Sequence, residues 1–586
     1  MHISMKKILI PLLSALAVLT ACNQDLLEIP QNNVITTDTF YQTDEDAEAA
    51  LVAVYENLIT NICTSNWGIY NPVRSAFNLC GDDLYAAGSS FGDNDFMAAL
   101  NEFRYDTSSE VLTKAYSGFY FVIYYCNLVI NNFENGLPDG TQTAVTKRTV
   151  AEARVIRAYC YMMLATGWGT PPHILKPIGP YDFPGNYEGT QADLYNWCAN
   201  ECETAAADLD ERQSTADKAG VVKVTKGFAY AVAGKSYVFA GDFPKAKTAL
   251  GKVISSQKYA LVPGERLWEN FHVEGDCNEE KLFEANFQNN GNFDWGTYAG
   301  HTTWMEANIW GWRSDRFVVS PNESLTGIEG WGGLGVPKWF ADAFVANDGT
   351  DSYRLNNTII SIEDAIYKTN YGLADVDGMT IEQKKTSDKV GIKAAGLYGQ
   401  SFYLALKQQP HMSDMWYPGA NLRLNNYVFM RYAEVLLLYA EACYKAGDSA
   451  GALDAIKQIQ NRAGSKTVST SVDMDVIERE KLFELWLEGC RWADMLRWGK
   501  VDRVKNAASA VPVMYDKLTR TPDKSDANVQ WMYGSESNSR YYTVDTHAAI
   551  DSGYEVGFKT GKHELFPFPF QVTNVNKVIT QNPGWN

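Results

Sequence analysis

A series of amphipathic helices near the C-terminus, between residues 425 and 499, constrains the fold of this chain most. One apolar face, at the i, i+3, i+4, i+7 spacing of a helix, consists of Tyr432, Val435, Leu436, Tyr439, Ala440 and Cys443. A second face of the same helix consists of Ala433, Leu437 and Tyr444. A helix that is apolar on two faces packs between neighbouring helices. We therefore expect layered helices and a mainly α fold.

A helical hairpin pattern occurs twice. Ala240-Gly241-Asp242 and Ala446-Gly447-Asp448 each follow one predicted helix and precede another. Glycine suits the left-handed position after a last helical turn, and aspartate caps the next helix. Small residues follow both motifs at one spacing, which lets antiparallel helices approach closely, as in a tetratricopeptide hairpin. The full consensus of about 34 residues is absent.

Apolar periodicity predicts the other helices and the organisation of the chain. Helices are predicted over residues 44–62, 109–134, 143–166, 190–211, 223–240, 243–256, 427–463 and 474–498. The chain is rich in Gly, Asn, Trp and Tyr from 257 to 425, with only short periodic runs. The predicted parts are a signal peptide (1–21), an extended leader (22–43), a helical part (44–256), a loop-rich inserted subdomain (257–425), and a C-terminal helical part with an irregular tail (426–586).

Short motifs along nearly the whole mature chain support a family resemblance. They are Phe40-Tyr41, Ala151-Glu152-Ala153, Arg157-Ala158-Tyr159, Arg431-Tyr432-Ala433-Glu434, Glu441-Ala442, Asn461-Arg462-Ala463-Gly464, Glu478-Arg479, Glu488-Gly489, Arg491-Trp492, Arg497-Trp498-Gly499 and Gln581-Asn582-Pro583-Gly584. With these motifs the chain resembles the RagB/SusD family of surface glycan-binding lipoproteins of Bacteroidetes. The resemblance implies an α-superhelix of tetratricopeptide-like hairpins that supports a less regular subdomain.

The N-terminus has the pattern of a lipoprotein signal. Lys6 and Lys7 precede an apolar run from Ile8 to Leu19, and the run ends in Leu19-Thr20-Ala21-Cys22. That run is too short to span a membrane, which needs about 20 apolar residues. We expect cleavage before Cys22 and lipidation of its thiol and amine, which anchors the chain without spanning the bilayer. The alternative is an ordinary signal peptide with a chance cysteine.

The net charge of the chain narrows the classes of ligand that it can bind. Removal of residues 1–21 takes away Lys6 and Lys7 but no acid, so the formal net charge changes from −19 to −21. An acidic chain is a poor partner for nucleic acid and, less strongly, for polyanionic glycans.

Nine cysteines follow Cys22 without a C-x-x-C pair. Cys63 and Cys80 flank an irregular region and are candidates for a disulfide.

The strongest candidate site is the aromatic region from Asn289 to Phe340. It contains six of the sixteen tryptophans of the chain, among Gly, Asn, Asp and His residues. An indole ring can stack on the C–H face of a pyranose while polar neighbours bind its hydroxyls. The preferred ligand-binding residues are Trp295, Tyr298, Trp304, Trp310 and Trp312, with Arg313 or Asp315 as polar partners. The alternative is that these tryptophans form the core of the subdomain, and we expect two or three of them at a binding surface.

A second candidate site lies after the first long helix. Trp67 and Tyr70 stand there between Asn66, Gly68 and Asn71. This loop resembles one contributor to the ligand site of the family. We rank it below the central aromatic region.

The sequence matches known catalytic and metal-binding motifs only in part. Gly88-Ser89-Ser90-Phe91-Gly92 fits G-x-S-x-G but lacks the strand and helix that a nucleophile elbow needs. Glu484 and Glu488 are one helical turn apart, and ion pairing between helices explains them better than glycoside hydrolysis. No H-E-x-x-H motif is present. Residues 375–378 resemble part of a calcium loop, but Leu373 and Lys384 stand where acids are needed, so structural calcium stays open without an assigned site.

The resemblance implies a non-catalytic function. A lipid-anchored protein of this family would face outward from the outer membrane, bind an oligosaccharide, and deliver it to a SusC-like TonB-dependent transporter. Some relatives take peptides, so a peptide ligand is the main alternative. A surface glycosidase is a second alternative, and it would need two acids at the binding cleft. No cofactor is expected.

Overall fold

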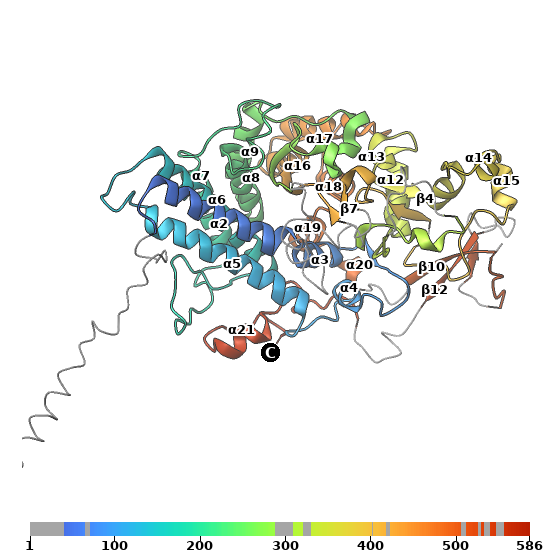
Figure 1. Cartoon of the computed structure of the whole chain (residues 1–586), viewed down its shortest axis with the longest axis horizontal. Coiled ribbons are helices and arrows are strands. Elements are labelled where there is room, and N and C mark those ends of the chain that lie inside the picture. Colours follow the sequence, from blue (N-terminus) through green and yellow to red (C-terminus); the bar gives the residue numbers. More distant parts are fainter. Residues whose placement is uncertain are drawn as a thin grey trace, which may run out of the picture.

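The computed structural model describes residues 40–64, 71–287, 309–319, 330–400, 402–417, 422–505, 511–517, 519–525, 529–531, 540–545 and 556–585. Long helices occupy the left and centre of the molecule in Figure 1, and short strands lie on the right. The mainly α prediction is therefore confirmed. Among the described residues, no helix combines the length and apolar character needed to cross a membrane.

Nine helices form a continuous array in the described part of the chain. They are α2 (Asp44–Leu58), α5 (Glu110–Phe133), α6 (Ala144–Trp168), α7 (Gln191–Ala205), α8 (Lys226–Ala240), α9 (Phe243–Ser255), α16 (Tyr432–Lys445), α17 (Ser449–Ala463) and α18 (Met474–Glu484). Each helix of this set contacts the next one. The array is a tetratricopeptide-like superhelix, and α16 is buried on the two faces that its sequence predicts.

The two predicted hairpins are confirmed. Gly241 ends α8 with φ of 80°, and Gly447 follows α16 with φ of 84°, a conformation that glycine adopts without strain. The Asp242 side chain accepts a hydrogen bond from the backbone N–H of Lys245, at the start of α9. Asp448 caps α17 in the same way, and its carboxylate also pairs with Lys247 of α9 at 2.7 Å. The second hairpin is thereby joined to the first.

Two predicted helices have different bounds in the structure. Residues 427–431 form strand β9 (Tyr427–Arg431), which pairs antiparallel with β2 (Lys281–Ala285), so a helix over 427–463 is wrong at its start. The predicted helix 474–498 is interrupted between α18 and α19 (Arg491–Trp498). Leu487 and Gly489 both have positive φ there, which a helix does not allow.

The remaining described elements are short. The helical segments are η2 (Ile59–Cys63), α3 (Pro72–Leu79), α4 (Asp95–Asn101), η3 (Gly264–Phe271), η4 (Val273–Gly275), η6 (Ser314–Arg316), α12 (Lys338–Asp348), α13 (Tyr353–Asn356), η7 (Asp364–Lys368), α14 (Ala374–Asp377), α15 (Ile381–Thr386), η8 (Met412–Asp414), α20 (Asp502–Lys505) and α21 (Phe570–Val575). The strands are β1 (Tyr85–Ala86), β3 (Leu334–Gly335), β4 (Ile359–Ser361), β5 (Leu397–Tyr398), β6 (Tyr403–Ala405), β7 (Met415–Tyr417), β8 (Leu422–Arg423), β10 (Val511–Asp516), β11 (Gln530–Trp531) and β12 (Arg540–Asp545).

The strands form one four-stranded sheet, in the order β11-β12-β10-β5, and four two-stranded sheets. Strand β5 belongs to the predicted inserted subdomain, whereas β10, β11 and β12 belong to the predicted tail. The tail therefore completes a sheet with the insert. All described pairings are antiparallel.

A buried ion-pair network joins the helical array to the insert. The guanidinium of Arg431 contacts Glu280 at 2.6 Å, Glu484 at 2.7 Å and Glu488 at 2.7 Å. Burial raises the pKa of Glu488, but Arg431 and Lys407 outweigh this effect and lower the pKa to about 2. The prediction that Glu484 and Glu488 form ion pairs between elements is confirmed.

The nine described cysteines are free and buried. The thiol of Cys63 bonds to the carbonyl of Leu58, and that of Cys80 bonds to the carbonyl of Leu100. The disulfide considered between Cys63 and Cys80 is therefore wrong, because each thiol is buried in the apolar core and bonds to a backbone carbonyl instead. Cys22 lies outside the described residues.

Candidate functional site

The structure buries two of the tryptophans that the sequence pattern predicts to bind a ligand. Trp310 and Trp312 are each 4% exposed. Trp310 packs in the main core, whereas Trp312 packs in a smaller core of the insert, where its Nε1 donates a hydrogen bond to the Ala405 carbonyl. The predicted stacking role of Trp310 and Trp312 is therefore wrong, because neither ring presents a face to solvent.

Five other residues that we predicted to bind a ligand lie outside the described residues. They are Trp67, Tyr70, Trp295, Tyr298 and Trp304. Arg313 is half-buried, and its Nε and Nη2 both donate to the carboxylate of Asp315 at 2.7 Å. The two polar residues are thus neighbours, and their contact with a ligand stays a prediction.

The described ends of two segments, the aromatic segment 288–308 and the later segment 320–329, lie side by side. The backbone N–H of Gly333 donates to the carbonyl of Ile309 at 2.7 Å, and Gly330 donates to Trp312 at 2.7 Å. A Cβ at Gly330 would lie 2.2 Å from the carbonyl carbon of Gly311, so this approach of two chains requires glycine. The described residues that follow the two segments therefore lie next to each other.

The described residues that follow segment 65–70, which carries Trp67 and Tyr70, lie close to the strand that precedes segment 288–308. The guanidinium of Arg74, in the first turn of α3, lies 4.3 Å from the centroid of the Tyr427 ring. Tyr427 pairs with Ala285, a few residues before the segment 288–308 begins. The described flanks of the two predicted sites thus converge.

A cleft lies next to these flanks, and we call it the Trp339 cleft. Its volume is about 410 Å³, and it is lined by Gly81, Asp82, Leu84, Tyr85, Asn101, Pro337, Trp339, Asp502, Arg503 and Val504. Strand β1 carries Tyr85 and pairs with β3, with Tyr85 opposite Gly335. Gly333, which fixes the end of the aromatic segment, also accepts a hydrogen bond from the backbone of Ala87. The cleft and the aromatic segments therefore share one strand pair.

The indole of Trp339 is the main aromatic surface of the cleft. The guanidinium of Arg503 lies 3.9 Å from its ring centroid, and its Nε1 donates to the Asp82 carbonyl at 3.2 Å. The Asp82 carboxylate accepts two hydrogen bonds from Arg491, at 2.7 and 2.9 Å. The ring position is thus fixed by α20 and by the segment after α3. An oriented indole beside a guanidinium can stack on a sugar ring and bind its hydroxyls.

Sequence analysis missed most of this cleft. Trp339 belongs to the predicted aromatic region but not to the preferred set of ligand-binding residues. Asp82, Tyr85 and Arg503 carry no local signal at all. Their proximity depends on contacts between segments that are distant in the sequence.

A larger cavity of about 670 Å³ lies beside α5. Its lining is mostly apolar, whereas a bound sugar needs hydrogen bonds for its hydroxyls. We therefore place the candidate site at the Trp339 cleft, although that cleft is smaller.

The acidic side chains that could serve a glycosidase form ion pairs with basic side chains of the protein. Glu484 is buried, and three guanidinium groups lower its pKa well below the ordinary value against the effect of burial. In the cleft, Asp82 is bound by Arg491, and Asp502 pairs with Lys505 on the surface at 3.1 Å. Both acids of the cleft lining are thus engaged in ion pairs with basic side chains.

Among the described residues, no group of three or more His, Cys, Asp or Glu side chains is arranged to hold a metal ion. In the segment that resembles a calcium loop, Asp375 pairs with Lys389 at 2.7 Å and Asp377 accepts from the Tyr371 backbone. Calcium therefore has no assigned site in this part of the chain.

Comparison with known proteins decides the family. The model of the SusD family matches residues 279–585, which is more than half of the chain. The chain belongs to the SusD family. A SusD-like protein of Bacteroides ovatus is 25% identical over 515 residues, which cover 85% of this chain and 83% of that protein. SusD-like protein P38 of Formosa agariphila is 21% identical over 523 residues, covering 84% and 91%.

Solved structures of SusD-like proteins share the fold. A laminarin binding SusD-like protein has a TM-score of 0.67 and 22% identity, and the match covers 93% of this chain and all of that one. Surface glycan-binding protein A from Bacteroides thetaiotaomicron, in complex with laminarihexaose, has a TM-score of 0.67 and 20% identity over 92% of this chain and all of that one. The predicted superhelix is thus the fold of SusD-like proteins.

Proposed function

We propose that this SusD-family chain is a non-catalytic binding protein for an oligosaccharide. The observation that carries the proposal is the indole of Trp339, held under the Arg503 guanidinium in an open cleft near the described end of the aromatic segment 288–308. Rings of this kind bind the apolar face of a pyranose. The laminarihexaose complex of a protein with the same fold supports a β-glucan as the first ligand to test.

The place of the protein in the cell is the second part of the proposal. Lipid on Cys22 would hold the domain at the outer face of the outer membrane, where it would deliver its ligand to a SusC-like TonB-dependent transporter. The signal sequence and lipobox support the anchor. Membrane fractionation of the Cys22→Ser variant, with its signal peptide intact, tests the lipid anchor, and we expect the variant to lose its membrane association. Co-purification of a transporter from native membranes tests the partner.

The direct test is isothermal titration of the mature chain, made soluble by Cys22→Ser. The ligands are laminari-, cello-, malto-, xylo- and manno-oligosaccharides, together with a tryptic digest of casein. We expect saturable heat with one class of glycan. Heat with the peptides alone would overturn the glycan proposal in favour of the peptide alternative. Release of shorter sugars during incubation would instead indicate a glycosidase.

A further inference from the structure

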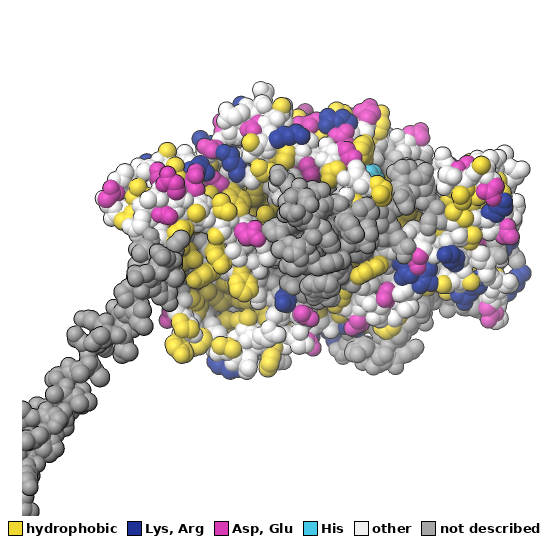
Figure 2. Space-filling view, in the orientation of Figure 1, with side chains coloured by type: hydrophobic (Ala, Val, Ile, Leu, Met, Phe, Trp, Pro, Cys, Tyr) yellow, Lys and Arg dark blue, Asp and Glu magenta, His cyan; other side chains and the backbone are white. Residues whose placement is uncertain are grey.

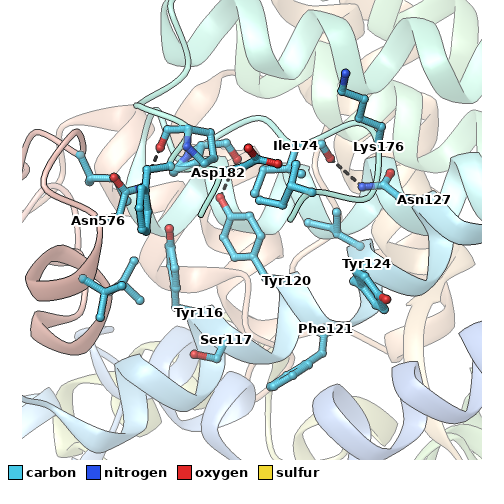
Figure 3. A pocket seen from close by; sticks show the side chains of 18 of the residues that line it. Tyr116, Ser117, Tyr120, Phe121, Tyr124, Asn127, Ile174, Lys176, Asp182 and Asn576 are labelled. Atoms are coloured by element: carbon cyan, nitrogen blue, oxygen red, sulfur yellow. Dashed lines mark hydrogen bonds between the residues drawn. The ribbon is translucent and has the colours of Figure 1, made fainter. Parts of the chain in front are cut away.

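The cavity of about 670 Å³ is a groove between three parts of the chain. Helix α5 forms one wall, residues 172–184 form the second, and α21 with the residues after it forms the third. Figure 3 shows Tyr116, Tyr120 and Tyr124 of α5 along one side, with Ile174, Lys176, Asp182 and Asn576 around them. We call this cavity the α5–α21 groove.

The groove is an exposed apolar surface. Phe121 is 56% exposed and Tyr124 is 46% exposed, and Phe183 and Val575 are exposed as well. Figure 2 shows hydrophobic side chains gathered in a recess between the positions of α5 and α21. A contiguous apolar surface of this kind on a folded domain indicates that another group covers it.

Three polar side chains of the groove lining form hydrogen bonds with backbone carbonyls of its own walls. The Asn127 side chain donates to the Ile174 carbonyl at 2.9 Å, and the Tyr120 hydroxyl donates to Pro172 at 2.6 Å. The Asn576 side chain donates to Pro184 at 2.7 Å. These bonds hold the walls together and leave few groups for the hydroxyls of a sugar. The groove therefore suits an apolar ligand better than a glycan.

The chain itself enters the structure at one end of the groove. Tyr41 packs edge-to-face on Phe133, the last residue of α5, with ring centroids 5.7 Å apart. Burial and the nearby Tyr124 and Tyr125, two residues of the groove lining, raise the pKa of Tyr41. Tyr41 also has φ of 63°, so the chain turns sharply where it meets the body. Residues that precede Phe40 thus start beside the groove.

The leader has the length and composition to fill the groove. Residues 23–39 can span about 60 Å when extended, whereas the part of α5 from Tyr116 to Tyr124 is about 12 Å long. The apolar residues of the leader are Leu26, Leu27, Ile29, Pro30, Val34 and Ile35. Pro30 disfavours a helix and favours extended chain. Asp25 and Glu28 complement the charge of Lys176 in the groove lining.

We propose that residues 23–39 bind back along the α5–α21 groove as an extended apolar strap. The strap covers the exposed rings of α5 and fixes the direction in which the N-terminus leaves the domain. Its effect on how the domain is held at the membrane rests on the proposed lipidation of Cys22. Its binding to the groove depends neither on the lipid nor on a glycan.

Disulfide cross-linking in the mature Cys22→Ser chain tests the strap. Ser117→Cys places a thiol in the groove lining, and Val52→Cys is the matched control on the exposed face of α2, also within reach of the leader. Each is combined in turn with Leu26→Cys, Ile29→Cys or Val34→Cys. We expect at least one of the leader cysteines to form a disulfide with Ser117→Cys. The rate of this reaction should be at least ten times the fastest rate measured with Val52→Cys. Equal rates at the two sites would overturn the proposal, as would cross-linked dimers in place of intramolecular products.

A second pair of variants tests whether the cross-link depends on the apolar residues of the leader or reports chance contact between the leader and the groove. Replacing Leu26, Leu27 and Ile29 together by serine should abolish the fast cross-link and increase the fluorescence of an apolar dye in the groove. Replacing Gln31, Asn32 and Asn33 by serine should change neither. An unchanged cross-link after loss of the apolar residues would contradict the strap. Glycan titration of the same variants reports on the proposed function separately.

Discussion

The guanidinium of Arg503 lies over the ring of Trp339, 3.9 Å from its centroid, and joins α20 to the first turn of α12. A cation at this distance from an indole is attracted by the electrons of the ring. The contact therefore orients an aromatic surface at the edge of an open cleft. The buried tryptophans that the structure describes pack in the hydrophobic cores, whereas this partly buried ring lines a cleft.

Trp339→Ala should weaken oligosaccharide binding. Loss of a stacking anchor costs about 1 to 3 kcal/mol, which raises Kd by roughly 5- to 150-fold. Isothermal titration measures the change, and Tyr181→Ala, which removes a highly exposed ring outside the cleft, is the control. Unchanged affinity in Trp339→Ala would remove this residue from the site.

Trp312→Ala should act on stability instead. The ring is buried in the core of the insert, and truncation of a buried aromatic residue costs about 3 to 5 kcal/mol. Urea unfolding followed by circular dichroism measures the loss. A variant of normal stability that no longer binds a glycan would show that Trp312 belongs to the site after all.

Much of the helical array could be predicted from the sequence. The apolar periodicity of α16 and the Gly-Asp pairs at Gly241 and Gly447 are local signals, because a helix and its caps depend on neighbouring residues. The errors at 427–431 and near Leu487 arose where tertiary pairing with β2 and a left-handed residue overrode that periodicity.

The candidate site was harder to predict, because exposure is a tertiary property. Trp310 and Trp312 lie in a Gly-rich context that carries no helical or strand period, so nothing local indicated which way they point. The contact of Arg503 with Trp339 joins two segments far apart in the sequence. Only the composition of the region, rich in Trp, Gly and Asn, was informative.

Arg431→Met should strongly destabilise the protein. Its removal takes one cationic partner from each of the buried carboxylates of Glu280, Glu484 and Glu488, and breaking a buried ion pair costs about 3 to 5 kcal/mol. Lys500→Met is the matched control, because its pairs with Asp475 and Glu478 are partly exposed and should contribute less than about 1 kcal/mol. Similar unfolding midpoints in urea for the two variants would contradict the structural role of the network.

Acid should destabilise the protein through its buried, ion-paired glutamates, which include Glu488 of this network and Glu441, a partner of Arg497. Guanidinium and ammonium partners lower the pKa of Glu488 to about 2 and that of Glu441 to about 2, against the effect of burial. The pKa of glutamate in an unfolded chain is about 4.3. A lowered folded-state pKa gives stability that is fully present above pH 4.3 and is lost as the pH falls toward 2. Each group contributes a slope of up to about 1.4 kcal/mol per pH unit.

Urea unfolding at a series of pH values between 5 and 2 checks this expectation. Glu488→Gln is less stable at pH 5, and its stability should depend less steeply on pH than that of the unaltered protein. Parallel curves for the two proteins would show that Glu488 does not titrate with folding.

The central claim is that the Trp339 cleft binds an oligosaccharide, and a crystal structure with the glycan that gives saturable heat tests it most directly. We predict electron density for a pyranose ring in contact with Trp339 and within hydrogen-bond distance of Arg503. Sugar density at another surface, with the Trp339 cleft empty in the same crystal, would contradict the account.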